Sequence, residues 1–453
     1  MECISAISTA PGTGGVAIIR ISGENALSVA EKMFSPAGKT PVRDFEPYRM
    51  YVGEIDATDF KDKGMCVYFK APKSFTGENV IELHCHGGEA IAHGILEKTF
   101  DCGARPATNG EFTKRAFLNG KLSLSSCEGL IDMINSESVA QIRSGFYLFK
   151  EKLKNRIEAV QSVLTDVLAG IDANIDYPEE GLITDDGAAI KEKLISAEKE
   201  IQGLVDSYSE GSVLVNGIKV ALVGKTNTGK SSLLNALTGE QRAIVTDIEG
   251  TTRDVVEGSL QINGVKFIVY DTAGIRETND PVELLGIKRS KDLINASDVI
   301  LYVTDGTESA GEVERFISEL SDKKYVVIKN KSDLSYDANA LSAGNKTESG
   351  TVRTLSVSCL TGENIQKLKD VLYTLGANDV RTDGGYVTEK RHYYALKDSL
   401  ESLECAINAI GVQPLDLISY DVKACWEKLG EITGTTASEK IIDEIFSKFC
   451  VGK

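Results

Sequence analysis

The stretch IKVALVGKTNTGKS, residues 218–231, joins a short apolar run to a glycine-rich loop and decides the fold of the central part of the chain. The apolar run predicts a buried strand, and the following SSLLNAL predicts a helix. Between a strand and a helix, this pattern of glycines, lysine and serine is typical of a phosphate-binding loop. Backbone N–H groups of the loop converge on phosphates, Lys230 neutralises the β- and γ-phosphate charge, and the Ser231 hydroxyl ligates Mg²⁺.

Two further motifs follow apolar runs in the way that a guanine-nucleotide site requires. DTAG, residues 271–274, follows the run 265–270, and its aspartate would support the Mg²⁺ shell while its glycine N–H contacts the γ-phosphate. NKSD, residues 330–333, follows the run 324–328, and the Asp333 carboxylate can accept from both N1–H and the 2-amino group of guanine. Adenine has no such pair of donors, so the motif predicts GTP rather than ATP.

The loop TDIEGTTRD, residues 246–254, has the threonines expected of a switch segment, and we interpret Thr252 as the Mg²⁺ ligand within it. Ser358 and Cys359 stand where a loop packs on the guanine, although Leu360 replaces the basic residue common after them. The residues that we expect at the nucleotide are Asn227, Thr228, Gly229, Lys230, Ser231, Ser232, Thr246, Asp247, Ile248, Glu249, Gly250, Thr251, Thr252, Asp271, Thr272, Ala273, Gly274, Asn330, Lys331, Asp333, Ser358 and Cys359.

The residues that promote hydrolysis are less plain. Ile275 occupies the position at which a glutamine orients the attacking water in Ras-like switches. Glu283 is our candidate for the group that orients water, with Lys230 as the second catalytic residue. A solvated carboxylate at a helix end is the alternative interpretation of Glu283. No arginine finger is evident, and the side-chain oxygen of Asn227 could instead hold a cation such as K⁺.

The sequence on either side of this α/β segment predicts two other kinds of structure. Residues 1–118 alternate short apolar runs with turns, which is typical of an α+β domain. Apolar residues from Ile142 to Ile171 recur at steps of three and four and predict one long helix, and a second helix follows over about 186–208. The same spacing returns over residues 396–410. We therefore predict one discontinuous helical domain, 119–215 with 377–453, into which a Ras-like P-loop domain, 216–376, is inserted.

Composition excludes several classes. The net charge of −17 argues against a general nucleic-acid binder, and nine scattered cysteines do not suggest a disulfide framework. No apolar run approaches the roughly 18 residues of a membrane-spanning helix, and the N-terminus does not resemble a signal peptide. These features predict a cytoplasmic protein.

With these motifs, the chain closely resembles the MnmE (TrmE) family of tRNA-modifying GTPases. The resemblance extends along the chain through GGVAIIRISG (14–23), FTGEN (75–79) leading to Glu82 and His86-Gly87-Gly88, RAFLN (115–119) leading to Lys121, EITG (431–434) and the C-terminal FCVGK (449–453). It implies an N-terminal domain that dimerises and binds 5-formyl-tetrahydrofolate or a related folate. It also implies action on tRNA with a flavoprotein, MnmG (GidA), to place an aminomethyl or carboxymethylaminomethyl group on C5 of the wobble uridine.

The resemblance further assigns residues. It implies that Arg20, Glu82, Lys121 and Lys453 contact the folate, and that Glu283 is the catalytic glutamate of K⁺-stimulated hydrolysis. It places K⁺ on Asn227, Thr246, Ile248 and Thr251, and Mg²⁺ on Ser231 and Thr252. Two departures from the family pattern are Thr226, where a proline is usual, and Leu360.

Several alternatives stay open. A ribosome-assembly GTPase shares the nucleotide motifs, and a switch that does not depend on turnover would share them too. The folate site could serve structure rather than catalysis. Cys450 matches the cysteine of the family tail without a defined role. His84 and His86 alternate along one strand, and we interpret them as structural residues because no third metal ligand is evident.

Overall fold

The structure of the protein is a computed structural model, which describes residues 2–176, 187–239, 256–271, 292–318, 323–334, 346–347, 350–351, 354–377 and 385–453. The chain forms two compact units. The first contains residues 1–134, 145–202 and 394–453, and the second contains residues 135–144 and 203–393.

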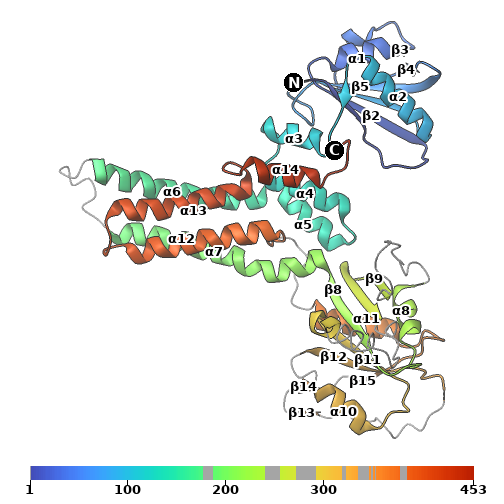
Figure 1. Cartoon of the computed structure of the whole chain (residues 1–453), viewed down its shortest axis with the longest axis vertical. Helices are drawn as coiled ribbons and strands as arrows, with labels where there is room; N and C mark the ends of the chain where they lie inside the picture. The colour runs from blue at the N-terminus through green and yellow to red at the C-terminus, as the bar shows by residue number, and fades with distance from the viewer. Residues whose placement is uncertain are drawn as a thin grey trace, which may run out of the picture. The chain divides into compact units, whose positions relative to one another are not determined.

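The first unit begins with a seven-stranded sheet (Figure 1). Its strands lie in the order β3-β4-β5-β6-β2-β1-β7, and all pairs are antiparallel except β1 with β7. Apolar residues alternate along β6 and face a core that helices α1 and α2 cover. The strands are β1 Ile4–Ile7, β2 Val16–Ser22, β3 Phe34–Pro36, β4 Met50–Asp56, β5 Lys61–Phe69, β6 Val80–His86 and β7 Arg105–Pro106, and the helices are α1 Ala26–Met33, η1 Val42–Asp44 and α2 Glu89–Asp101.

Helix α3, Glu111–Leu118, packs on the other face of this sheet. Its Phe112 is fully buried in a small cluster with Ile4 and Ala6 of β1. Ala6 pairs with Arg20 of β2, and Arg20 pairs with Glu82 of β6. Residues directly opposite in neighbouring strands share a face, so Arg20 and Glu82 lie on the face of the sheet that α3 covers.

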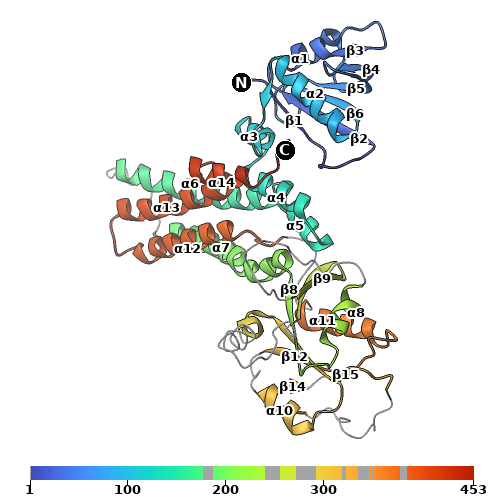
Figure 2. The same cartoon turned by 45° about the vertical axis from the view of Figure 1, so that its right-hand side comes forward.

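The helical part of the chain is assembled from segments that are far apart in sequence. Its helices are α4 Leu124–Asn135, α5 Val139–Phe149, α6 Lys152–Asp176, α7 Gly187–Asn216, α12 Lys390–Ala409, α13 Leu415–Thr433 and α14 Glu439–Ser447. Helix α6 packs along α13, where Gln161 Nε2 donates a hydrogen bond of 2.9 Å to the Trp426 carbonyl. Helices α7 and α12 lie side by side in both views (Figures 1 and 2). The predicted discontinuous helical domain is confirmed.

The prediction of a single helix over 142–171 is wrong in one respect. The helix stops after Phe149 and restarts at Lys152, because Glu151 adopts a left-handed conformation with φ of 57°. Ile142 and Phe146, which were expected on the apolar stripe, are nearly half exposed in α5. The buried stripe therefore begins only with α6, at Leu153.

The second helix was expected to end near Tyr208, but α7 continues to Asn216. Its extension is held by contacts that are remote in sequence. The Val215 carbonyl accepts a hydrogen bond of 2.7 Å from Gln141 Nε2, and the Leu214 side chain is buried in the core of the six-stranded sheet. Tertiary contact, rather than local sequence preference, sets the length of this helix.

The second unit contains a six-stranded sheet of order β15-β12-β11-β8-β10-β9. Every pair is parallel except β9 with β10. Leucines of α8 and α11 join the core on one side of the sheet, and Phe316 of α10 packs on the other side. The predicted doubly wound P-loop domain is confirmed. Its elements are β8 Ile218–Val223, α8 Lys230–Thr238, β9 Val256–Ile262, β10 Val265–Asp271, β11 Val299–Thr304, α10 Ala310–Ser318, β12 Lys324–Lys329, β15 Thr354–Ser356 and α11 Ile365–Gly376, with a small ribbon of β13 Lys346–Thr347 and β14 Gly350–Thr351.

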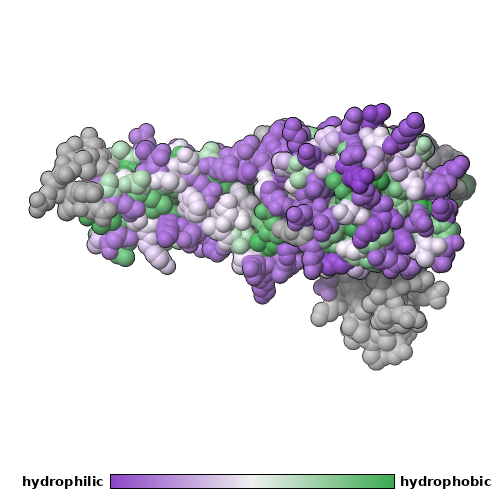
Figure 3. All heavy atoms as spheres, turned by 90° about the horizontal axis from the view of Figure 1, so that it is seen from above, coloured by the Kyte–Doolittle hydropathy of each residue, from purple (hydrophilic) through white to green (hydrophobic). Residues whose placement is uncertain are grey.

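The surface agrees with the composition. In the view of Figure 3, hydrophilic residues cover most of the described surface and hydrophobic residues form small separate patches. Among the described residues, no helix combines the length and the apolar character needed to span a bilayer.

The contact between α4 and α5 depends on glycine and yields a prediction of stability. A Cβ at Gly129 would lie 2.5 Å from the Gly145 carbonyl oxygen and 2.6 Å from Leu148 Cβ. Gly129→Ala should destabilise this contact by about 1–3 kcal/mol, because overpacking outweighs the higher helix propensity of alanine. The measurement is hydrogen exchange of the α4 and α5 amides.

Gly203→Ala is the matched control, because a Cβ at Gly203 of α7 meets no atom within 4 Å. Alanine at this position should leave the hydrogen exchange of the α4 and α5 amides at the wild-type rate or slow it. Equal protection of α4 in both variants would contradict the close packing at Gly129.

Candidate functional site

The loop between β8 and α8 is held against β11 by close backbone contacts. Gly224 has φ of 150°, and a Cβ there would collide with the Val303 carbonyl oxygen. Gly229 has φ of 91°, and a Cβ there would collide with the Asn330 side chain. Both positions require glycine on grounds of space and of backbone conformation. The loop therefore takes the tight strand-to-helix turn that the sequence predicts.

Lys230, the first residue of α8, points back over this loop. Its Nζ donates hydrogen bonds to the carbonyl oxygens of Gly224 and Lys225, at 2.7 and 2.6 Å. Burial lowers the pKa of Lys230, although Asp271 and Glu308 act in the opposite direction. A desolvated ammonium group at a helix N-terminus suits a polyphosphate, because the low local dielectric strengthens the attraction.

Ser231 and Asp271 meet where β8 and β10 end side by side. The Ser231 hydroxyl donates to Asp271 Oδ2 at 2.6 Å, and Asp271 is almost fully buried. A hydroxyl and a carboxylate oxygen at this spacing are hard donors of the kind that Mg²⁺ accepts alongside phosphate oxygens and water. The residues present thus fit the expected Mg²⁺ at this edge of the sheet.

The NKSD motif lies against the same loop. Asn330 is buried, and its Nδ2 donates to the Thr228 carbonyl at 3.0 Å. Lys331 has φ of 61°, and its Nζ contacts the Asn227 carbonyl and Asp305 Oδ2 at 2.9 and 3.0 Å. The motif therefore stabilises the phosphate-binding loop through these hydrogen bonds.

Asp333 faces the loop after β15, as a base-recognising carboxylate should. Its Oδ1 accepts a hydrogen bond of 2.5 Å from the buried Ser358 hydroxyl. Cys359 N–H is 3.4 Å from Asn330 Oδ1, so the two segments are joined at a second point. Leu360 is 86% exposed, and its side chain does not contribute to packing of this loop.

The structure describes twelve of the expected nucleotide residues, and contacts join all of them except Ser232, which is exposed in α8; they are Asn227, Thr228, Gly229, Lys230, Ser231, Ser232, Asp271, Asn330, Lys331, Asp333, Ser358 and Cys359. The remainder lie outside the described residues, namely Thr246, Asp247, Ile248, Glu249, Gly250, Thr251, Thr252, Thr272, Ala273, Gly274 and Glu283. Their roles stay predictions.

A second group of polar residues lies on the α3 face of the N-terminal sheet. Arg20 Nε and Nη2 both lie 2.9 Å from Glu82 Oε1. The Arg20 guanidinium also lies over two aromatic rings, 5.6 Å from the Phe75 centroid and 5.7 Å from that of Phe112. Burial by itself would raise the pKa of Glu82, but the neighbouring His84 and Arg20 outweigh it and hold that pKa below its usual range.

His84 is a residue of this group that sequence reasoning missed. Its Nε2 lies 3.5 Å from Glu82 Oε2, whereas His86 is engaged with Asp62 at 2.6 Å. The alternation along β6 was the available signal, since it puts His84 and Glu82 on one face. The sequence did not show that only His84 would lie beside the carboxylate.

The remaining two predicted folate residues, Lys121 and Lys453, are held by contacts with different segments. Lys121 Nζ donates to the Pro72 carbonyl at 3.0 Å, in the loop that also carries Phe75. Lys453 follows Gly452, whose carbonyl accepts from the Ser8 hydroxyl at 3.1 Å beside the end of β1. Cys450 is exposed rather than packed as a small apolar residue.

A cavity of about 320 Å³ lies elsewhere in the same domain, between α2 and the end of β1. Its lining includes Ser5, Thr9, His93, Leu96 and Phe100. Neither Arg20 nor Glu82 lines the cavity, although Ala6 of β1 does. The cavity is therefore separate from the Arg20–Glu82 group.

The fold and the nucleotide loop define a P-loop GTPase that carries an α+β domain and a discontinuous helical domain. The family model described as "MnmE helical domain" matches residues 124–450, and that described as "GTP-binding protein TrmE N-terminus" matches residues 3–121. The tRNA modification GTPase MnmE of Natranaerobius thermophilus is 37% identical, over 100% of this chain and 99% of the relative. That of Clostridioides difficile is 38% identical, with the same coverage of both chains. The chain belongs to the MnmE family of tRNA modification GTPases.

Solved structures resemble parts of the chain. Era in complex with MgGDPNP and nucleotides 1506–1542 of 16S ribosomal RNA is 25% identical, covers 41% of this chain and 66% of its own, and gives a TM-score of 0.28. The G domain of the T. maritima FeoB iron transporter is 23% identical, covers 34% of this chain and 94% of its own, and gives a TM-score of 0.27. The family assignment rests on the full-length sequence matches.

Asp333 yields a test of base recognition. Asp333→Asn keeps an oxygen that can accept from Ser358, but it replaces an acceptor at the base by an amide donor. The affinity for GTP should fall about 10- to 100-fold, because a donor of guanine is left unpaired. The affinity for xanthosine triphosphate, which has a carbonyl in place of the 2-amino group, should fall less or rise. Equilibrium titration of both nucleotides measures this, and equal losses would rule out base reading by Asp333.

Proposed function

We propose that the chain is a K⁺-stimulated GTPase that modifies C5 of the wobble uridine in certain tRNAs. In this proposal it acts in the cytoplasm as a homodimer together with a flavoprotein of the MnmG (GidA) kind. A 5-formyl-tetrahydrofolate or related folate supplies or positions the one-carbon unit that becomes the aminomethyl or carboxymethylaminomethyl group. The observation that carries the proposal is the coexistence, in one chain of this family, of a GTPase loop and the Arg20–Glu82 group.

The Arg20–Glu82 group has the chemistry that a folate requires. A pterin ring has an amide-like edge whose N–H groups suit a carboxylate, and Glu82 is held ionised by its neighbours. The glutamate tail of a folate is anionic and suits a lysine or an arginine. Lys121 and Lys453 are the expected partners of that tail. The residues present thus fit the proposed ligand.

In this proposal, the P-loop domain would hold two metal ions. Ser231 and Thr252 would hold Mg²⁺, which supplies compensation of phosphate charge. Asn227, Thr246, Ile248 and Thr251 would hold K⁺ in the place of an arginine finger. Asn227 is exposed in the phosphate loop with φ of 63°, and its amide oxygen is a hard donor. Lys230 neutralises the phosphates, and Glu283 orients the attacking water.

The cation mechanism is tested by steady-state GTP hydrolysis in KCl and in NaCl at matched ionic strength. The wild-type chain should be stimulated strongly by K⁺. Asn227→Gly is the suitable variant, because glycine tolerates the positive φ and lacks the side chain that carries the amide oxygen. It should lose about tenfold or more of the K⁺ stimulation and keep GTP affinity, since one metal ligand is missing.

Equal rates of the wild-type chain in the two salts would contradict the cation mechanism. In that case, the ribosome-assembly and passive-switch alternatives would gain support. If the Asn227→Gly variant keeps full K⁺ stimulation, Asn227 is not a ligand of the K⁺ ion.

The tRNA function is tested by reconstitution with the flavoprotein, GTP, a folate one-carbon donor and tRNA that lacks the modification. Mass spectrometry of the nucleosides measures the product. Glu82→Gln should lower the rate of modification about tenfold or more, because its amide meets the pterin N–H groups with the wrong polarity. GTP hydrolysis without tRNA should not change.

Glu54→Gln is the matched control, because Glu54 is an exposed glutamate of β4 in the same sheet. It should modify tRNA at the wild-type rate. If Glu82→Gln behaves like this control, the group around Arg20 does not serve the reaction.

A further inference from the structure

The loop between β5 and β6, residues 70–79, forms one wall of the Arg20–Glu82 group. Its Phe75 places a ring 5.6 Å from the Arg20 guanidinium, and the Phe75 side chain is 37% exposed. Its Pro72 carbonyl accepts from Lys121. The loop then leads directly into β6, which carries Glu82. The positions of three predicted folate residues therefore depend on how this loop is held.

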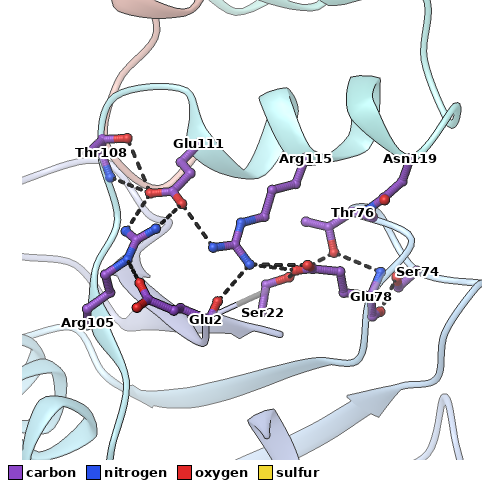
Figure 4. A network of polar contacts seen from close by, with 10 residues as sticks. All are labelled: Glu2, Ser22, Ser74, Thr76, Glu78, Arg105, Thr108, Glu111, Arg115 and Asn119. Atoms are coloured by element: carbon purple, nitrogen blue, oxygen red, sulfur yellow. Dashed lines mark hydrogen bonds and ion pairs between the residues drawn. The ribbon is translucent and has the colours of Figure 1, made fainter. Parts of the chain in front are cut away.

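Glu78 fixes the base of the loop (Figure 4). Its Oε2 accepts from the Ser22 hydroxyl at 2.8 Å and from Arg115 Nη1 at 2.9 Å. Thr76 Oγ1 lies 2.8 Å from the Ser22 hydroxyl, and the Thr76 carbonyl accepts from Asn119 Nδ2 at 2.7 Å. Polar contacts of this kind are directional, so they fix the path of the loop as well as its distance from the sheet.

Arg115 is the centre of this network, and its side chain is 5% exposed. Besides Glu78, it donates to the Glu2 carbonyl at 2.9 Å and to Glu111 Oε1 at 2.9 Å. Glu111 in turn pairs with Arg105, away from the loop (Figure 4). A buried guanidinium that loses one carboxylate keeps an uncompensated charge, so its remaining contacts rearrange.

We propose that the buried Arg115–Glu78 pair is a positioning pair for the Arg20–Glu82 site, and that Phe75, which it holds over Arg20, stacks on the flat ring of the bound ligand. An exposed aromatic ring beside a guanidinium and a carboxylate suits a planar heterocycle with an amide-like edge. The proposal rests on the proposed folate function and adds to it a stacking residue and the pair that places it. Arg115 and Glu78 themselves do not contact the ligand.

A tryptophan at Phe75 reports on both parts of the proposal. Trp426 is the single tryptophan of the chain, so Trp426→Phe with Phe75→Trp leaves one indole at the site. In the full-length chain, 5-formyl-tetrahydrofolate should change the indole emission as the rings stack. Adding Glu78→Gln should shift the emission of the free protein and weaken folate binding about tenfold or more, since a buried pair is broken.

Glu111→Gln is the matched control, because Glu111 is the other carboxylate of the same arginine and does not touch the loop. Glu111→Gln should leave the indole emission unchanged and alter the folate affinity by less than about threefold, because a residue distant from the site couples only weakly to it. A purely structural role of the network predicts equal effects of the two glutamine variants. Equal affinities and equal emission would therefore overturn the proposal.

Ser22→Ala keeps the test valid if Glu78→Gln does not fold. It removes one hydrogen bond to Glu78 and one to Thr76 without leaving a charge unpaired. It should weaken folate binding in the same direction, and unchanged binding would overturn the proposal. Amide hydrogen exchange of β2 and β6 in each preparation shows whether the N-terminal domain is folded.

The failure of this proposal can be distinguished from that of the folate function. If the wild-type chain does not bind 5-formyl-tetrahydrofolate, both the folate function and the positioning pair are contradicted. If the wild-type chain binds the folate, the Glu82→Gln variant does not and the Glu78→Gln variant does, only the positioning pair is contradicted.

Discussion

Burial of the apolar stripe of α6 is the constraint on which the rest of the chain depends. The side chains of Leu153, Ile157, Leu164 and Ile171 are buried, and an isolated helix could not bury them. Their partner is α13, which lies beyond the whole nucleotide-binding segment in sequence. The pairing closes the helical domain across the insertion, so the two ends of that segment must return to the same domain.

The same pairing carries the end of the chain back to its beginning. After α13, helix α14 contacts α3, where Lys114 and Asp443 form an ion pair of 2.7 Å. Val451 then bridges Asn109, and Gly452 packs against Ile7. Lys453 therefore reaches the N-terminal sheet because a helix pair elsewhere has fixed the chain that precedes it. The tail is a tertiary feature of this domain.

The two sites use different properties of a sheet. At the P-loop, parallel strands end at one edge, where the loops after β8 and β12 meet Lys230 and Asp271, the last residue of β10. In the N-terminal domain, antiparallel register places Arg20 opposite Glu82 on one face, and a loop closes over the pair. The first arrangement is set by topology and the second by register and by a buried ionic network.

The sequence alone determined the features that depend on residues close together along the chain. A glycine-rich turn between a strand and a helix, and motifs directly after apolar strands, fix the P-loop domain and the expected contacts of Lys230 and Asp271. The helical spacing of three and four predicted the discontinuous helical domain. The resemblance of the motifs predicted the family. Glu283 and the switch segment lie outside the described residues, so their roles rest on sequence.

Only the tertiary structure decided the features that depend on distant contacts. The left-handed conformation of Glu151 ends α5, and contacts of Leu214 and Val215 with distant segments hold the part of α7 beyond Tyr208. The ring of Phe75 over Arg20 and the pair of Arg115 with Glu78 join segments that are separated in sequence. A pattern of residue types encodes which face of a strand or helix is apolar, but not which charged side chains meet once loops are packed. That choice belongs to the folded chain, because burial makes an unpaired charge costly and so selects one arrangement.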